Sequence, residues 1–220
     1  MAVSNKIRNF MEQGSWIRKM FEEGIALKLE HGDKNVFDLS LGNPVIDPPE
    51  EFFIELRKIA QSPVKGMHRY MPNAGLQQTR LAVADQLIIE TGLEFGAGDV
   101  VMTCGAGGAL NVVMRTLMDP GDEFVIFSPF FVEYHFYADN HSGSCKVVPP
   151  DENFLPDMEA FRNTITNKTR GVLINSPNNP TGVLYNADVL RELSEIIREK
   201  ENEFGTEIYL VSDEPYRKLI

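Results

Sequence analysis

From about residue 99 to residue 213, short runs of apolar and β-branched residues alternate with segments that have helical spacing. This alternation is typical of a mostly parallel sheet with helices on both faces. The strand-like runs are apolar almost throughout, as burial on both faces of a sheet requires. The sequence therefore predicts an α/β fold, with strands expected in the runs DVVMT, EFVIFS, CKVVP, RGVLINS and EIYLVSD.

The N-terminal part of the chain has a different pattern. Residues 15–32 carry apolar side chains at helical spacing and end at Gly32, which predicts an amphipathic first helix. Further helices are expected from about Pro49 to Ala60 and over residues 77–92, where Gly92 suits the C-terminal cap. Because residues 42–49 are rich in proline, we place the boundary between an N-terminal arm and the α/β body there.

Composition argues against several classes of function. The chain has 32 acidic and 21 basic residues and a net charge of -11, so neither nucleic acid nor an anionic membrane is an expected partner. No segment approaches the roughly 18 apolar residues of a membrane helix, and the first residues lack a secretion signal. We expect a cytoplasmic protein. Cys104 and Cys145 form no CxxC pair and the four histidines show no ligand spacing, so no metal site is expected.

Ligands of open α/β sheets bind beyond the carboxyl ends of the strands. One such end is followed by GAGGAL, residues 105–110, which opens a helix with three glycines. The free N–H groups and the dipole of such a helix start can bind a phosphate. The sequence has no Walker A lysine and no GxGxxG spacing at this point, which disfavours a nucleotide. Close packing of strand and helix is an alternative reason for the glycines.

Three other strand ends carry side chains suited to a planar ligand. The aromatic residues of SPFFVEY, residues 128–134, can stack on a ring, although such clusters often belong to a core. The prolines and asparagines of SPNNPTG over-determine a loop, which fits a need to aim Asn179. In SDEPY, Asp213 and Tyr216 follow an apolar strand, and a buried or half-buried Asp213 carboxylate needs either a basic protein group or a cationic ligand atom as its partner.

The succession of SPNNPTG and SDEPY resembles the pyridoxal-phosphate-dependent aminotransferases of class I/II, which have fold type I. Five further segments look like family segments in family order: LSLGNPVIDPP, YMPNAGLQQTRLAVADQL, GAGGAL, DPGDEFVIFSPFFVEY and FLPDMEAFRNTITNKTRG. The resemblance implies a three-layer sandwich around a mostly parallel, mixed sheet, the large domain of a pyridoxal phosphate (PLP) dependent transferase.

By motif match, the resemblance implies a phosphate site for the cofactor. Gly105, Ala106 and Gly107 would hold the phosphate of pyridoxal 5'-phosphate through their backbone and small side chains. Tyr70, in YMPNAG, is similar to a tyrosine that reaches this phosphate across a dimer interface. A homodimer is therefore implied as well.

The remaining matches surround the cofactor ring. Phe131 would stack on it, Asn179 and Tyr216 would bond its phenolic oxygen, and Asp213 would pair with its nitrogen. A carboxylate at that nitrogen raises the nitrogen's pKa, and the protonated ring is the better electron acceptor. The resemblance also implies that Gly42 and Asn179 bind the substrate carboxylate.

The family's Schiff-base lysine has no match in this sequence. The resemblance places it beyond SDEPY, with a substrate-binding arginine later still, whereas Lys218 stands only five residues after Asp213. We therefore expect no catalytic residue in this chain and no transamination by it alone. Residues 1–45 are expected to form an N-terminal arm and small-domain segment, and residues 46–220 an incomplete PLP-binding large domain whose C-terminal part is absent.

The activity implied by the resemblance is transfer of an amino group between an amino acid and a 2-oxo acid, a reaction of amino acid metabolism. Two alternatives stay open. Because the cofactor breaks the bonds, the same scaffold also suits a PLP-dependent β-lyase or a cyclopropane-forming synthase. The second alternative is a non-catalytic protein that binds PLP. The donor and acceptor are not predicted.

Overall fold

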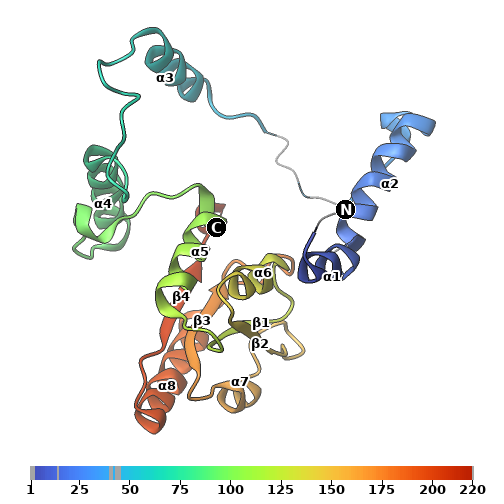
Figure 1. Ribbon diagram of the computed structural model, residues 1–220, viewed down its shortest axis with the longest axis vertical. Helices are drawn as coiled ribbons and strands as arrows, with labels where there is room; N and C mark the ends of the chain where they lie inside the picture. Colours follow the sequence, from blue (N-terminus) through green and yellow to red (C-terminus); the bar gives the residue numbers. More distant parts are fainter. Residues whose placement is uncertain (1–2, 14, 40–41, 43–45, 220) are drawn as a thin grey trace. The chain divides into compact units, whose positions relative to one another are not determined.

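The computed structural model describes residues 3–13, 15–39, 42 and 46–219. The chain divides into two units, Met1–Arg69 and Tyr70–Ile220. Figure 1 labels the helices and strands of each. This division lies later in the chain than the boundary that we predict near residues 42–49. Asn43 and Pro44, in the predicted bent connection, lie outside the described residues. The assignment of residues 1–45 to a small domain stays a prediction.

Helices make up the regular structure of the first unit. They are α1 (Asn5–Gln13), α2 (Ser15–His31), the short 3-10 helix η1 (Asp33–Asn35) and α3 (Glu50–Gln61). The predicted first helix is confirmed as α2, which ends before Gly32 at a φ of 82°. The helix expected after Pro49 is confirmed as α3, whose first turn contains two glutamates that complement its dipole. The sequence analysis did not predict α1.

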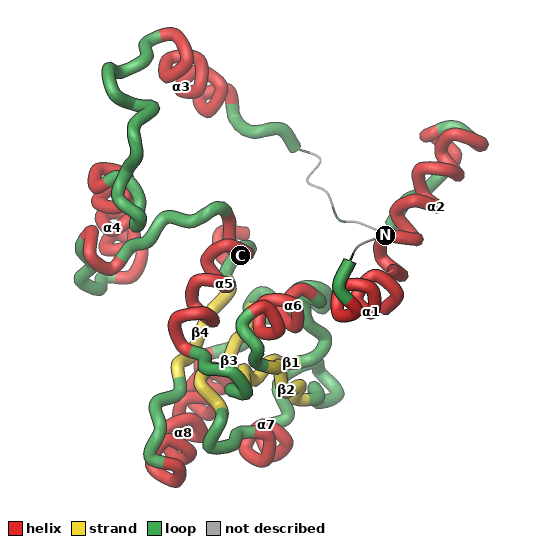
Figure 2. Tube along the Cα trace, viewed as in Figure 1, coloured by secondary structure: helices red, strands yellow, loops and turns green. Residues whose placement is uncertain are grey.

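The second unit is built on a four-stranded sheet in which every described pairing is parallel, with the strand order β2-β1-β3-β4 (Figure 2). The strands are β1 (Glu123–Phe127), β2 (Ser144–Val148), β3 (Thr169–Asn175) and β4 (Tyr209–Asp213), and all four were expected from apolar runs. The helices are α4 (Gln77–Thr91), η2 (Ala97–Asp99), α5 (Gly105–Leu117), α6 (Glu133–Asn140), α7 (Met158–Thr164), α8 (Ala187–Phe204) and η3 (Arg217–Leu219). As predicted, Gly92 caps α4 in the left-handed conformation.

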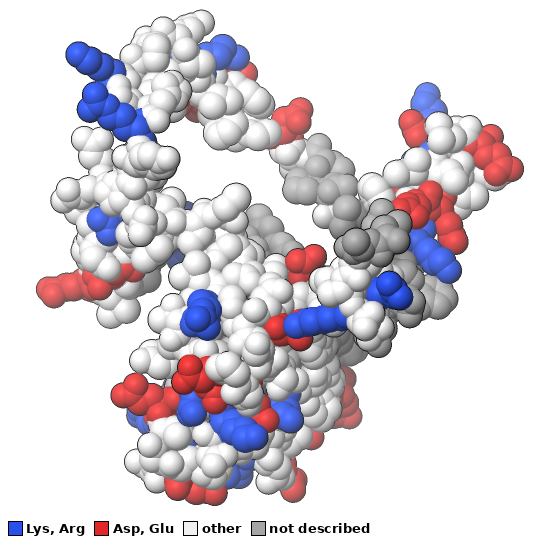
Figure 3. Space-filling view, viewed as in Figure 1, with Lys and Arg blue, Asp and Glu red and all other residues white. Residues whose placement is uncertain are grey.

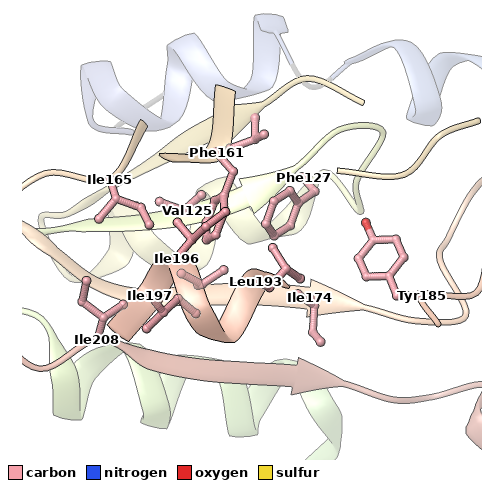
Figure 4. Close-up of a cluster of buried hydrophobic side chains, with 12 residues drawn as sticks. Val125, Phe127, Phe161, Ile165, Ile174, Tyr185, Leu193, Ile196, Ile197 and Ile208 are labelled. Carbon is pink, nitrogen blue, oxygen red and sulfur yellow. The ribbon is translucent and has the colours of Figure 1, made fainter. Parts of the chain in front are cut away.

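Helices cover both faces of this sheet, which confirms the α/β sandwich. Successive side chains of β1 point to opposite faces: Val125 and Phe127 join one buried cluster, and Phe124 and Ile126 join another. We name the first the α7–α8 cluster, shown in Figure 4, which consists of Val125, Phe127, Val148, Phe161, Ile165, Val172, Ile174, Tyr185, Leu193, Ile196, Ile197 and Ile208. The second, the α5–α6 cluster, consists of Leu110, Met114, Met118, Phe124, Ile126, Tyr134, Ala138 and Leu173.

The predicted strand DVVMT, residues 99–103, is wrong. Residue Asp99 ends η2, and residues 100–103 pair with no strand among the residues described. Instead, Met102 N donates to Ala74 O at 2.9 Å, in the loop before α4. A β-branched run becomes a strand only where a neighbouring strand offers its edge, so the composition of this run was not sufficient.

Candidate functional site

The candidate site lies at the carboxyl edge of the parallel sheet. Because β1, β3 and β4 run in the same direction, the segments that follow them emerge at this edge. They are residues 128–132, 176–182 and 214–216, which include most of the ring-binding residues predicted from sequence. Electrostatic interactions and ring contacts connect side chains from these segments with α6.

The start of α5 has the properties of an anion site. Gly105 has a φ of 71°, a conformation that other residues rarely adopt, and α5 has neither a side-chain cap nor an acidic residue in its first turn. A Cβ at Gly107 would lie 2.8 Å from Tyr137 Oη, so only glycine fits there without movement of the tyrosine. Gly105 N donates to Thr103 O at 3.1 Å, so in this helix start the N–H groups of Ala106 and Gly107 are left for a ligand, and the helix dipole favours an anionic one.

Asp213, the last residue of β4, has a partner that the sequence analysis did not identify. Tyr134 Oη donates to Asp213 Oδ2 at 2.7 Å, although 79 positions separate the two residues. Tyr134 is buried on α6, and burial together with the Asp213 charge raises its pKa above the ordinary value. The tyrosine therefore stays protonated and donates to a half-buried Asp213 carboxylate. This partner is a neutral hydroxyl, whereas the sequence predicts a basic group or a cationic ligand atom.

A buried amide connects the ends of β3 and β4. Asn175 Oδ1 accepts from Asn179 N at 2.7 Å, and Asn175 Nδ2 donates to Asp213 O at 2.8 Å. Asn175 is only 6% exposed and lies opposite Asp213 in the parallel ladder. It therefore holds the loop of Asn179 against the end of β4. The sequence analysis missed Asn175, although it applied the relevant signal, a polar residue ending an apolar strand, to Asp213.

The loop that follows β3 is closed by its own hydrogen bonds. Asn178 Oδ1 accepts from Thr181 Oγ1 at 2.8 Å, and Asn178 O accepts from Gly182 N at 2.7 Å. Gly182 has a φ of 73°. Asn178 Nδ2 also donates to Pro129 O at 3.3 Å, which connects this loop to the segment after β1. These bonds support the prediction of an over-determined loop around Asn179.

Aromatic rings border the same edge. Phe131 is 39% exposed, whereas its neighbour Phe130 packs against the α5–α6 cluster. The Phe131 and Tyr134 rings meet edge to face, with centroids 5.7 Å apart. Tyr216, after β4, is half-buried and interacts electrostatically with Tyr134. Phe131 is therefore accessible to a ligand. The alternative that these aromatic residues belong to the core applies to Phe130.

Two predicted site residues are not brought to this edge by any described contact. Tyr70 is fully exposed. Gly42 is exposed and belongs to the first unit, and no atom of the described residues lies within 4 Å of a Cβ built on it. Their roles remain predictions.

Three features bear on the classes of function that the composition argues against: the surface charge, the clusters of possible metal ligands and the apolarity of the helices. On the face of the second unit shown in Figure 3, basic side chains are scattered among acidic ones. Among the described residues, no cluster of His, Cys, Asp and Glu could hold a metal ion, and no helix has the length and apolarity to cross a membrane.

An apolar cavity of about 450 Å³ is distinct from the candidate site. It lies between α5 and β4, and its walls include Val101, Val112, Leu117 and Leu210. Within the described sheet, β4 pairs only with β3, so its other edge is open beside this cavity. No charged side chain of the described residues lines this cavity.

The fold is an open, parallel α/β sheet, and the candidate site lies at the carboxyl ends of its strands. The sequence model of the family "Aminotransferase class I and II" matches residues 34–220. The chain belongs to this family.

Individual relatives agree with the family match. The chain is 36% identical over 197 residues to a probable aspartate/prephenate aminotransferase of Thermus aquaticus, a match that covers 89% of the chain and 49% of the relative. It is 35% identical over 183 residues to a probable aspartate aminotransferase of Methanocaldococcus jannaschii, covering 83% and 46%. The chain is also similar to the crystal structure of an amino transferase from Eubacterium rectale, with a TM-score of 0.92 and 34% identity. This match covers 100% of the present chain and 56% of the chain in that structure. The chain spans about half the length of the curated relatives it matches.

Proposed function

We propose that this chain is the PLP-binding part of an aminotransferase that moves an amino group between an amino acid and a 2-oxo acid. The observation that carries the proposal is the Asp213 carboxylate, held by Tyr134 at the end of β4, at the same sheet edge as the exposed Phe131 ring. A planar cofactor with a basic ring nitrogen matches this pair of groups. The names of the relatives, which specify aspartate and prephenate, make aspartate the first amino donor to test.

The residues present fit the cofactor. The uncapped, glycine-rich start of α5 suits a phosphate, and the missing side chain of Gly107 leaves room that Tyr137 borders. The backbone and small side chains of Gly105, Ala106 and Gly107 would surround that phosphate, with the N–H groups of Ala106 and Gly107 as donors. Tyr70 would reach it across a homodimer interface.

The ring-binding residues would act through fixed charge and hydrogen bonds. Asp213 would hold a proton on the ring nitrogen, Phe131 would cover one ring face, and Asn179 and Tyr216 would donate to the phenolic oxygen. Gly42 and Asn179 would bind the substrate carboxylate. When bound, PLP supplies an electron sink for bonds broken at the amino acid's α-carbon.

A lysine for covalent attachment is not assigned. Lys218 Nζ forms an ion pair with Glu90 Oε1 at 2.7 Å, and its side chain is 67% exposed. This engagement agrees with the mismatch of Lys218 to the family position. We infer that the 220-residue chain binds PLP without transaminating and that a protein with the full length of the relatives would carry out the transfer.

Equilibrium dialysis with PLP tests the proposal on the chain itself. Asp213→Asn removes one negative charge, and we expect it to weaken binding by about tenfold, since charged hydrogen bonds contribute about 1.5–3 kcal/mol. Glu152→Gln is the matched control, because Glu152 is an exposed acid in a loop and should leave the affinity unchanged. Equal affinities for the Asp213→Asn variant and the unmodified chain would contradict the assignment.

Two further measurements address the chemistry. Borohydride reduction of the chain with PLP should label no lysine, and a labelled lysine accompanied by turnover would contradict the inference about Lys218. For a protein with the full length of the relatives, a 2-oxo acid formed only in the presence of an amino acceptor would indicate transfer of the amino group. Ammonia and pyruvate from cysteine conjugates would instead indicate a β-lyase.

A further inference from the structure

Tyr134 joins two groups of the candidate site that the sequence places on separate segments. Its hydroxyl donates to Asp213 Oδ2 at 2.7 Å, and its ring meets Phe131 at 81° with centroids 5.7 Å apart. None of the roles assigned above includes Tyr134. It is nevertheless the residue through which the anion at the end of β4 and the exposed ring after β1 are connected.

The location of the hydroxyl is fixed by the core. Tyr134 is 2% exposed and belongs to the α5–α6 cluster, where it packs with apolar residues such as Leu110 and Phe124. Its backbone carbonyl also accepts from Cys145 Sγ at 3.5 Å, on β2. A side chain packed in this way has few alternative rotamers, so its hydroxyl presents a fixed donor to Asp213.

The Asp213 side chain is less tightly packed than the Tyr134 side chain, so packing alone restricts its rotamers less. Asp213 is half-buried at the end of a strand, and among the described residues Tyr134 is the side chain that bonds its carboxylate. A group that pairs with a ring nitrogen must be held within about 0.5 Å of its working position. Because the Tyr134 hydroxyl holds Oδ2 of Asp213 in place, the second carboxylate oxygen, Oδ1, points in one direction.

We propose that Tyr134 is a positioning residue that holds the Asp213 carboxylate by one oxygen, so that the other oxygen faces a cationic ring nitrogen lying against Phe131. This inference rests on the proposed function for the identity of the ligand. The orientation of Asp213 in the ligand-free chain does not depend on that identity.

The charges around Tyr134 keep the bond in one direction. The titratable groups that face its hydroxyl are Asp213 on β4, Tyr137 on α6 and Tyr216 after β4. Burial raises the pKa of Tyr134, and the Asp213 carboxylate raises it further. The tyrosine therefore keeps its proton and donates it to the Asp213 carboxylate.

The ligand-free test is made by NMR on the uniformly labelled chain. Three-bond couplings measure the χ1 rotamer populations of Asp213 in the unmodified chain, in Tyr134→Phe and in the control Tyr185→Phe. Tyr185 is also a buried tyrosine, in the α7–α8 cluster, and its hydroxyl does not bond Asp213. We expect one dominant rotamer in the unmodified chain and the control, and averaged rotamers in Tyr134→Phe. An unchanged single rotamer in Tyr134→Phe overturns the proposal.

A second measurement uses ligands that need no lysine. Calorimetry gives the affinities of pyridoxine 5'-phosphate and of its 1-deaza analogue, which has carbon in place of the ring nitrogen. We expect the preference for the pyridine ring to fall by about tenfold in Tyr134→Phe, the lower range for a charged hydrogen bond. In an Asp213→Asn background, Tyr134→Phe should cause no further fall, because the two residues act as a unit.

The outcomes separate the two proposals. A preference that survives in Tyr134→Phe, or one that falls equally in Tyr185→Phe, contradicts the positioning role. If the unmodified chain binds neither probe, the proposed function fails for this chain, and the rotamers of Asp213 alone decide the role of Tyr134.

Discussion

Replacement of Asn175 by alanine should loosen the carboxyl edge of the sheet and lower the stability of the second unit. The change removes two hydrogen bonds, from Asn179 N at 2.7 Å and to Asp213 O at 2.8 Å, at a position that is 6% exposed. At about 0.5–1.5 kcal/mol for each bond, the expected loss of unfolding free energy is about 1–3 kcal/mol.

Urea denaturation of the chain measures this loss. With an m-value of about 2 kcal/mol/M, a loss of 2 kcal/mol lowers the urea midpoint by about 1 M and leaves the slope unchanged. Asn167→Ala is the control, because Asn167 is exposed and its side chain is not bonded to the rest of the described chain. We expect its effect to stay within about 0.5 kcal/mol.

Hydrogen exchange locates the effect. The Asn179 amide should lose protection in Asn175→Ala. In Asn175→Asp it should keep protection, because the acceptor oxygen is retained while the donor to Asp213 O is lost. If Asn175→Ala leaves both the urea midpoint and the Asn179 amide unchanged, Asn175 does not hold the two strand ends together.

Three further predictions concern other parts of the second unit. Gly171→Ala should destabilise the chain by about 1–3 kcal/mol in the same urea assay, because a Cβ on β3 would clash with the Phe124 ring in a packed core. Alkylation near pH 8 should modify the exposed Cys104 well before Cys145, whose pKa burial raises to about 12. Because the pKa of that thiol is higher in the folded chain than its ordinary value of 9.0, its contribution to stability is complete below pH 9 and is lost as the pH rises toward 12. The carboxyl of Glu90 should titrate near pH 2 by NMR, because hydrogen bonds and the two basic residues of η3 lower its pKa to about 2. The contribution of this carboxylate to folding stability is therefore present above pH 4.5 and is lost as the pH falls toward 2.

The parallel strands could be predicted because each needs only local information. The runs EFVIFS and RGVLINS are apolar almost throughout, and in the structure residues such as Val125 and Phe124 are buried on opposite faces of the sheet. The run DVVMT has the same composition, yet it forms no strand among the described residues because no neighbouring edge pairs with it. Strand propensity is local, whereas strand pairing is not.

The candidate site divides in the same way. Gly105, Phe131, Asn179 and Asp213 follow strands or open a helix, so the sequence located them, and the family resemblance supplied their expected roles. Tyr134 looked like one more aromatic residue in SPFFVEY, and its hydrogen bond to Asp213 spans 79 positions.

The sequence by itself determined the α/β class, the strand ends that carry polar residues and the family, because these follow from periodicity and from short motifs. The tertiary structure decided which side chains support them. Tyr134 and Asn175 reach Asp213 only after β1, β3 and β4 have aligned in parallel and α6 has packed on the sheet. The physical reason is that contacts across many residues depend on the register and packing of whole elements, which no local pattern specifies.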